Sequence, residues 1–232
     1  MASLRTTRCD PGPLVGLPSL LVDLTSDLGR GVSDSLGQVP YRLAYDHGLF
    51  ARMQAQAAVL GSNANASIRD LSRQVGHPCH LSFIVAGKVF VIAQAGPSRS
   101  NVGACLGAGS VLPMMLCASG QLLLAYAPPK KRAELLSDDC EYLALTGTQR
   151  QAFSLWLEAV RDGGCLVLRN YYDLGAVDFC TLAGDPESEF CPALTVTFSC
   201  SELPRGKKRA LFEGAVRERL RQLPGGARSL LQ

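Results

Sequence analysis

The spacing of the hydrophobic residues constrains this chain most, because it switches between the helical and the strand period along the sequence. Apolar residues recur at helical intervals over 44–60 and again over 67–75, with a break of small polar residues expected over 61–66. Residues 80–95 are instead rich in Val, Ile and Phe around a Gly-Lys break, a pattern that predicts a β-hairpin. A helical segment is therefore expected to lead into a sheet.

The rest of the chain continues this change of period. We predict a Gly-rich loop or strand pair over 103–113, helices over 118–126, 129–136 and 148–162, strands over 165–168, 179–182 and 193–198, and a last helix over 205–223. Helices before and after an antiparallel sheet indicate an α+β fold, in which the helices cover the faces of the sheet.

Composition narrows the class of protein. A hydrophobic fraction of 47% allows a packed core, and a net charge of +3 is too small for an overall electrostatic grip on nucleic acid. The nine cysteines form no Cys-x-x-Cys pair, which argues against a zinc ribbon and indicates a reducing compartment. The sequence has no signal core and no membrane-spanning stretch, so we expect a cytoplasmic protein without a membrane partner.

Several motifs then occur in a familiar order. The segment AGSVLPMMLCASGQLLLA at 108–125 resembles the central motif of IclR-type transcription regulators, roughly V-G-S-x-L-P-x-H-A-x-A-x-G-K-A-x-L-A. The segment PPKKRAEL at 128–135 resembles the P-P-E-E-R-x-x-L that follows in that family. VRDGG at 160–164 and ALTVT at 193–197 fall where the family has V-R-x-x-G-Y and A-L-S-V-S.

The resemblance implies a GAF-like antiparallel sheet with flanking helices, which the family joins to a winged helix-turn-helix. Residues 1–43 would then be an incomplete winged helix-turn-helix remnant with a recognition helix and a wing-like segment, and 44–60 a linker helix. Residues 61–224 would be the effector-binding domain and 225–232 a short tail.

The front of the chain is expected to lack a complete DNA-binding module. Only about 15 residues precede the segment that resembles the recognition helix, and two more helices of roughly 11 residues do not fit there. That segment carries Asp23 and Asp27, whose carboxylates repel phosphates. Ser19 and Arg30 are its candidate DNA contacts, and we expect DNA binding only where the missing helix-turn-helix is supplied.

The resemblance also implies an effector site at the start of one helix. Members of the family bind small carboxylates where unpaired backbone N–H groups and the helix dipole favour an anion. The matching residues here are Cys117, Ala118 and Ser119, and Met115 stands where the family has a histidine.

Further site residues are implied on the later strands. The family's acidic position falls on Leu168, its cysteine position on Asp178, and its two serine positions on Thr195 and Thr197. The hydroxyl groups are therefore kept while the acid is relocated. Because Met115, Leu168 and a nearby Phe198 are apolar, we expect an effector that is an organic or aromatic acid with a hydrophobic body.

These candidates also have plainer interpretations. Thr195 and Thr197 can be β-formers in a core strand, and Cys117 can serve packing alone. Asp178 can be a solvated loop carboxylate. The segment His77-Pro-Cys-His80 offers three metal ligands without a complete shell, and no signature supports a cysteine nucleophile.

The sequence indicates a ligand sensor rather than an enzyme. We expect no catalytic residue, cofactor or metal, and a small-molecule effector that shifts the equilibrium of a homodimer or tetramer by its differential affinity. One alternative is an effector-binding protein that does not bind DNA itself and acts through hetero-oligomers. The other is a small hydrolase-like enzyme on the same fold, which would need a convergent acid–base pair.

Overall fold

The computed structural model describes residues 64–85, 87–96, 106–173, 175–183, 186 and 191–201. Its sheet and flanking helices confirm the predicted α+β fold. The strands are β1 (Cys79–Val85), β2 (Lys88–Ala95), β3 (Val111–Leu112), β4 (Cys165–Arg169), β5 (Ala176–Leu182) and β6 (Ala193–Ser199). The helices are α3 (Ala118–Tyr126), α4 (Pro129–Ser137), α5 (Cys140–Leu143) and α6 (Gly147–Gly163), and residues 64–75 are also helical.

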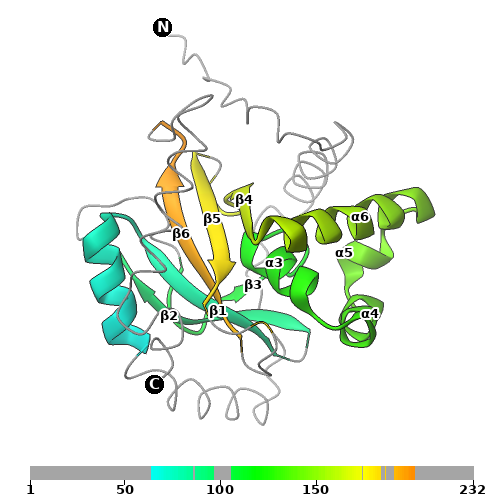
Figure 1. Ribbon diagram of the computed structural model, residues 1–232, viewed down its shortest axis with the longest axis horizontal. Coiled ribbons are helices and arrows are strands. Elements are labelled where there is room, and N and C mark those ends of the chain that lie inside the picture. The colour runs from blue at the N-terminus through cyan, green and yellow to red at the C-terminus, as the bar shows by residue number, and fades with distance from the viewer. Residues whose placement is uncertain are drawn as a thin grey trace, which may run out of the picture.

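The six strands form one sheet in the order β3-β2-β1-β6-β5-β4, and every neighbouring pair is antiparallel. At its centre β1 pairs with β6, so that His80 lies opposite Thr195 and Ser82 opposite Ala193. The first and the last of these strands in the sequence therefore meet in the middle of the sheet (Figure 1).

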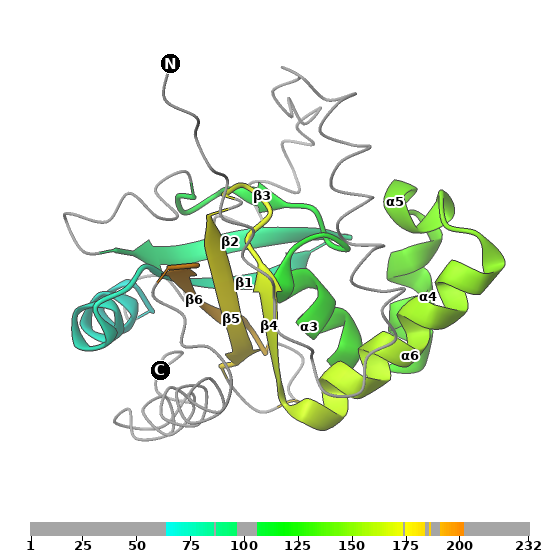
Figure 2. The same ribbon diagram turned by 90° about the horizontal axis from the view of Figure 1, so that it is seen from above.

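Each face of the sheet has its own apolar core, because side chains alternate between the two faces along a strand. One face packs against the helix of residues 64–75, and the other packs against α3 and α6. Figure 2 shows this helix and α3 on opposite sides of the strands. The α3 side is the one that carries the predicted effector residues.

Close contacts fix the position of α3. Gly120 lies against the preceding loop, and a Cβ at this position would be 2.8 Å from the carbonyl carbon and the Cα of Met114. The side-chain amide of Gln121 donates from Nε2 to the carbonyl oxygen of Met115 at 2.6 Å. Its Oε1 accepts the indole N–H of Trp156, in α6, at 2.7 Å. Gln121 therefore joins the loop, α3 and α6.

Helix α6 begins and ends where its sequence predicts. Thr146 is its N-cap, and the side chains of Thr146 and Gln149 form a reciprocal capping box. The helix ends before Gly164, whose φ of 70° is the left-handed conformation that favours glycine. Its buried side chains are the expected apolar stripe of Phe153, Trp156, Leu157 and Val160.

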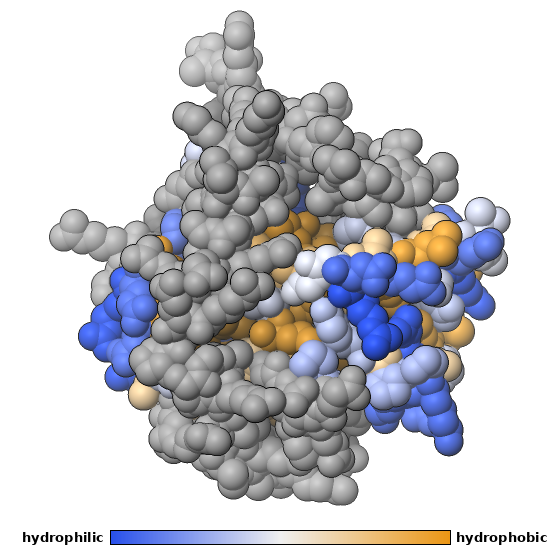
Figure 3. Space-filling view, viewed as in Figure 1, coloured by the Kyte–Doolittle hydropathy of each residue, from blue (hydrophilic) through white to orange (hydrophobic). Residues whose placement is uncertain are grey.

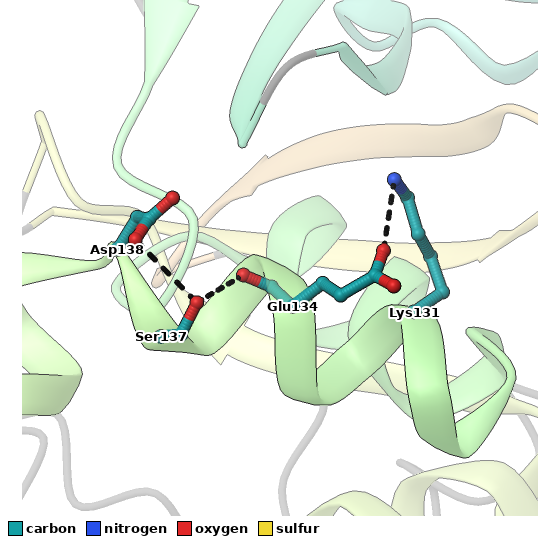
Figure 4. Close-up of polar contacts among 4 residues, drawn as sticks. All are labelled: Lys131, Glu134, Ser137 and Asp138. Carbon is teal, nitrogen blue, oxygen red and sulfur yellow. Dashed lines mark hydrogen bonds and ion pairs between the residues drawn. The ribbon is translucent and has the colours of Figure 1, made fainter.

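Helix α4 belongs to the outer surface of the domain. Figure 3 shows mostly hydrophilic side chains over the part formed by α4 to α6. Lys131 Nζ lies 3.7 Å from Glu134 Oε2, and Ser137 Oγ donates to the Glu134 carbonyl oxygen at 2.8 Å and to Asp138 Oδ1 at 3.4 Å (Figure 4). Because the charged side chains are 61% and 54% exposed, this ion pair adds little stability.

Most of the predicted elements within the described ranges are confirmed. The hairpin of β1 and β2, the helices α3, α4 and α6 and the strands β4 to β6 match their expected positions within a few residues. The break expected over 61–66 is wrong for residues 64–66, which are already helical. The four-residue helix α5 was not predicted, because it is too short to show a helical period.

Several predictions fall outside the described residues. These are the helix-turn-helix remnant of 1–43 with Ser19 and Arg30, the linker helix of 44–60, the last helix of 205–223 and the tail of 225–232. In the part of the chain that the structure describes, none of the helices is long and apolar enough to cross a membrane.

Candidate functional site

The first turn of α3 is buried against the sheet. Its N-cap is Cys117, whose Sγ accepts the backbone N–H of Gly120 at 3.3 Å and lies 3.5 Å from Ser119 Oγ. Cys117, Ala118 and Ser119 are each no more than 5% exposed. No backbone acceptor among the described residues takes the N–H groups of Ala118 and Ser119, as expected at a helix start. Two N–H groups at the positive end of the helix therefore have no backbone partner among the described residues.

A buried carboxyl group lies on β5, which packs against α3. Both carboxylate oxygens of Asp178 accept Asn170 Nδ2 at 3.0 Å, and Oδ1 also accepts the Thr197 hydroxyl at 2.7 Å. Burial raises the pKa of Asp178 to about 6, against the effect of these hydrogen bonds, which favour the charged form. Asp178 can therefore gain or lose a proton close to neutral pH.

The polar side chains on this face of β5 and β6 form a row that begins with Asp178 and Thr197, and a second pair continues it. Cys180 in β5 lies opposite Thr195 in β6, and the Thr195 hydroxyl donates to Cys180 Sγ at 3.3 Å. Burial raises the pKa of the Cys180 thiol well above its usual range and that of Cys117 to about 11. The negative charge of Asp178 adds to both effects, so the start of α3 and the β5 row share one electrostatic environment.

Strand pairing brings most of the remaining predicted residues to the same side. Phe198, expected near the site, instead lies in the core beside the 64–75 helix. Asp178 lies directly opposite Leu168 on β4 and opposite Thr197 on β6. Directly opposed residues of antiparallel strands share a face, so the apolar Leu168 and the relocated acid lie side by side. Met115 is buried in the same core as Cys117.

Two of the plainer interpretations are wrong. Asp178 lies within a strand and is 5% exposed, so it is not a solvated loop carboxylate. Cys117 does more than pack, because its sulfur caps α3. Thr195 and Thr197 do lie in a core strand, as β-formers would, and each donates a hydrogen bond to a β5 side chain.

The three candidate metal ligands of residues 77–80 do not converge. The His77 ring lies 4.4 Å from the ring of Phe198, and Cys79 is buried in the core beside the 64–75 helix. His80 follows Cys79 in β1 and therefore points to the opposite face. Over the described ranges no group of three or more His, Cys, Asp or Glu side chains could hold a metal ion, and the cysteines are free thiols.

Four polar residues of this face were not predicted, namely His80, Ser82, Asn170 and Cys180. His80 and Ser82 join it only through the pairing of β1 with β6, and Asn170 only through its contact with Asp178. Such long-range pairings leave no periodic signal in the sequence. The one available sign was the presence of polar residues in an otherwise apolar strand.

Comparison with known protein families identifies a family of bacterial transcriptional regulators. The sequence model of the family described as bacterial transcriptional regulator IclR, C-terminal, matches residues 55–223. No curated protein sequence matches the chain.

Solved structures of transcriptional regulators share the fold. A proposed transcriptional regulator from Rhodococcus sp. RHA1 is 19% identical with a TM-score of 0.60, over 88% of this chain and 81% of that one. An IclR homologue from Microbacterium hydrocarbonoxydans, complexed with 4-hydroxybenzoate, is 19% identical with a TM-score of 0.58, over 93% and 85%. The C-terminal domain of the E. coli regulator KdgR is 19% identical with a TM-score of 0.54, over 75% and 96%.

Proposed function

The chain belongs to the IclR-type family of bacterial transcriptional regulators, and on that premise we propose that it binds a small organic or aromatic acid between α3 and strands β5 and β6. Binding of this effector controls the assembly that acts on DNA. The observation that carries the proposal is the buried carboxyl group of Asp178, held by Asn170 and Thr197, on a strand that packs against the start of α3.

The chemistry of this face suits an acid. The N–H groups of Ala118 and Ser119 can bind a carboxylate at the positive end of α3. A second carboxylate close by further raises the pKa of Asp178, so that Asp178 takes up a proton and becomes a hydrogen-bond donor. Met115 and Leu168 supply the apolar surroundings that favour a hydrophobic body on the ligand.

An aromatic ligand is the first to test. The Microbacterium hydrocarbonoxydans homologue is complexed with 4-hydroxybenzoate, a small aromatic acid. For this chain we adopt the same class of compound, because the apolar residues of the candidate site fit a ring better than a short aliphatic acid.

The role that we propose is recognition and not catalysis. The family model that matches the chain describes a bacterial transcriptional regulator, and such proteins are not enzymes. The protein would act where DNA lies, in the cytoplasm, as a homodimer or tetramer whose equilibrium the effector shifts. Whether it contacts DNA itself or through a mixed oligomer is an outcome of the experiments below.

Thermal unfolding of the full chain with acetate, benzoate and 4-hydroxybenzoate tests the site. An acid that binds the folded state raises the melting temperature by mass action. Thr197→Val removes the hydroxyl that holds Asp178, so we expect its affinity for the acid to fall by about tenfold or more. Titration calorimetry measures that change directly.

Thr181→Val is the matched control. Thr181 lies on β5 too, but it pairs with Cys165 on the face turned toward the 64–75 helix, and its hydroxyl donates to the Gly164 carbonyl oxygen at 3.4 Å. We expect this variant to bind the acid like the wild type. Equal affinities of Thr197→Val and Thr181→Val, or no acid that raises the melting temperature, would contradict the proposed site.

A further inference from the structure

Two buried polar atoms on β1 have no hydrogen-bond partner. They are His80 Nε2 and Ser82 Oγ, and neither finds a partner in the part of the chain that the structure describes. His80 is 4% exposed and Ser82 is fully buried. A buried polar group without a partner destabilises a fold, and most such groups in native proteins have one. Their presence therefore requires an explanation.

The two atoms lie on the same side of the sheet as the proposed effector site. His80 pairs with Thr195 and Ser82 pairs with Ala193, which is part of the core beside α3. Thr195 in turn bonds to Cys180 on β5. Helix α3 packs against β1 as well as against β4, β5 and β6. His80 and Ser82, the β1 pair, therefore extend the row of polar side chains that begins at Asp178.

The chemistry of the β1 pair differs from that of the α3 end. Burial lowers the pKa of His80 to about 4, so its imidazole is neutral at physiological pH. A neutral imidazole nitrogen and a serine hydroxyl can donate or accept a hydrogen bond, but they offer no charge to balance an anion. They suit an uncharged group that both donates and accepts, and a hydroxyl group has this property.

We propose that His80 and Ser82 form a second polar subsite of the effector site, which takes an uncharged hydroxyl group, so that the effector is a hydroxy acid. This inference rests on the proposed function for the position of the acid end. Strands β1 and β5 are two strand spacings apart, roughly 10 Å. The ligand must therefore be elongated, with its hydroxyl group and its carboxylate at opposite ends of a ring or chain.

Three probes and two serine variants test the subsite. Benzoate, 4-hydroxybenzoate and phenol differ in whether they carry the acid, the hydroxyl group or both. Ser82→Ala should weaken 4-hydroxybenzoate by about tenfold, equivalent to one hydrogen bond, and leave benzoate unchanged. Because Ser82 Oγ has no partner among the described residues, we also expect this variant to be at least as stable as the wild type in urea.

Ser72→Ala provides the matched control. Ser72 is also a buried serine, but it lies in the 64–75 helix and its hydroxyl donates to the His77 carbonyl oxygen at 2.8 Å. This variant should lose stability and keep its affinity for all three probes. The two serines are therefore expected to show opposite patterns of stability and binding.

Nuclear magnetic resonance provides a readout that needs no change to His80 or Ser82. The chain has three histidines, and His77→Gln helps to assign their imidazole signals. We expect 4-hydroxybenzoate to shift the ring nitrogen signals of His80, and benzoate to leave them in place. This measurement keeps the inference testable if a His80 variant does not fold.

The outcomes separate this inference from the proposed function. If benzoate and 4-hydroxybenzoate bind equally and Ser82→Ala changes neither, the hydroxyl subsite is overturned, a buried water satisfies the pair, and the acid site stands. If only phenol binds and needs Ser82, the acid site fails and the subsite stands alone. If no probe binds, both are overturned.

Discussion

Burial shifts two pKa values on the α3 side of the sheet in opposite directions. The pKa of Asp178 is raised from its ordinary value near 3.8 to about 6, and that of His80 is lowered from 6.5 to about 4. The stability that Asp178 contributes is present below pH 3.8 and is lost as the pH rises through about 6. The stability that His80 contributes is present above pH 6.5 and is lost as the pH falls through about 4. Between about pH 4 and 6, the two opposite slopes of unfolding free energy against pH nearly cancel in the wild type.

A variant that removes only one of the two groups should reveal the pH dependence contributed by the other. Between pH 4 and 6.5 we expect Asp178→Asn to gain stability over the wild type as the pH rises, and His80→Gln to gain it as the pH falls. Each change should be about 3 kcal/mol or less. Urea unfolding at four pH values measures both slopes, with Asp138→Asn at the exposed end of α4 as a control. Parallel slopes for the two variants would refute the argument.

Individual site residues could be predicted only where a local motif carried them. Cys117, Ser119 and Asp178 were implied by the resemblance to the family, whose motifs assign the helix start and the position counted from Gly164. His80 lies opposite Thr195 through a pairing that spans more than a hundred residues, which no local pattern encodes. The register of distant strands depends on tertiary packing, so the β1 side of the proposed site could be inferred only from the structure.

Among the elements, α3 depends on a close approach that only glycine allows. Adding a Cβ to Gly120 forces the backbone of Met114 away from the helix start. We therefore expect Gly120→Ala to destabilise the domain by about 1–3 kcal/mol, as overpacking does, and to weaken acid binding as well. Urea unfolding together with titration calorimetry measures the two effects.

Helix α6 offers the matched substitution. A Cβ added to Gly163, in the last turn of α6, meets nothing within 4 Å. Because alanine has the higher helix propensity, Gly163→Ala should leave stability unchanged or raise it slightly, and binding should stay the same. A Gly120→Ala protein as stable as Gly163→Ala would show that the loop before α3 yields easily.

Helices and long strands could be predicted well, and short elements could not. The 17 residues of α6 carry a capping signal and several turns of apolar spacing. Strand β3 has two residues and α5 has four, so each spans about one period and shows no repeat. Their conformations are set by the neighbouring elements, as the pairing of β3 with β2 illustrates.

For the whole molecule, the proposed regulation requires that the effector prefer one assembly over another. We expect an acid that raises the melting temperature to change the sedimentation coefficient of the full chain. We also expect it to change the fluorescence anisotropy of a labelled DNA fragment from upstream of its own gene. Coupling of this kind is typically five- to 150-fold in affinity. Tight binding of the acid with neither change would contradict the regulatory role.

A partner would alter how that result is interpreted. If the full chain alone leaves the DNA anisotropy unchanged at low salt, the DNA contacts must come from another subunit. Addition of a family member with a complete helix-turn-helix should then restore an effector-dependent signal. If it does not, the mixed-oligomer alternative is wrong.

The pairing of β1 with β6 has a consequence for biosynthesis. A ribosome releases residues 79–112 long before residues 165–199, so β1 waits for its central neighbour while most of the domain is translated. His80 and Ser82 join Asp178 in one sheet only after β6 has emerged, because β6 pairs with both β1 and β5. A prematurely terminated polypeptide therefore lacks the proposed effector site, which would form in a single late step.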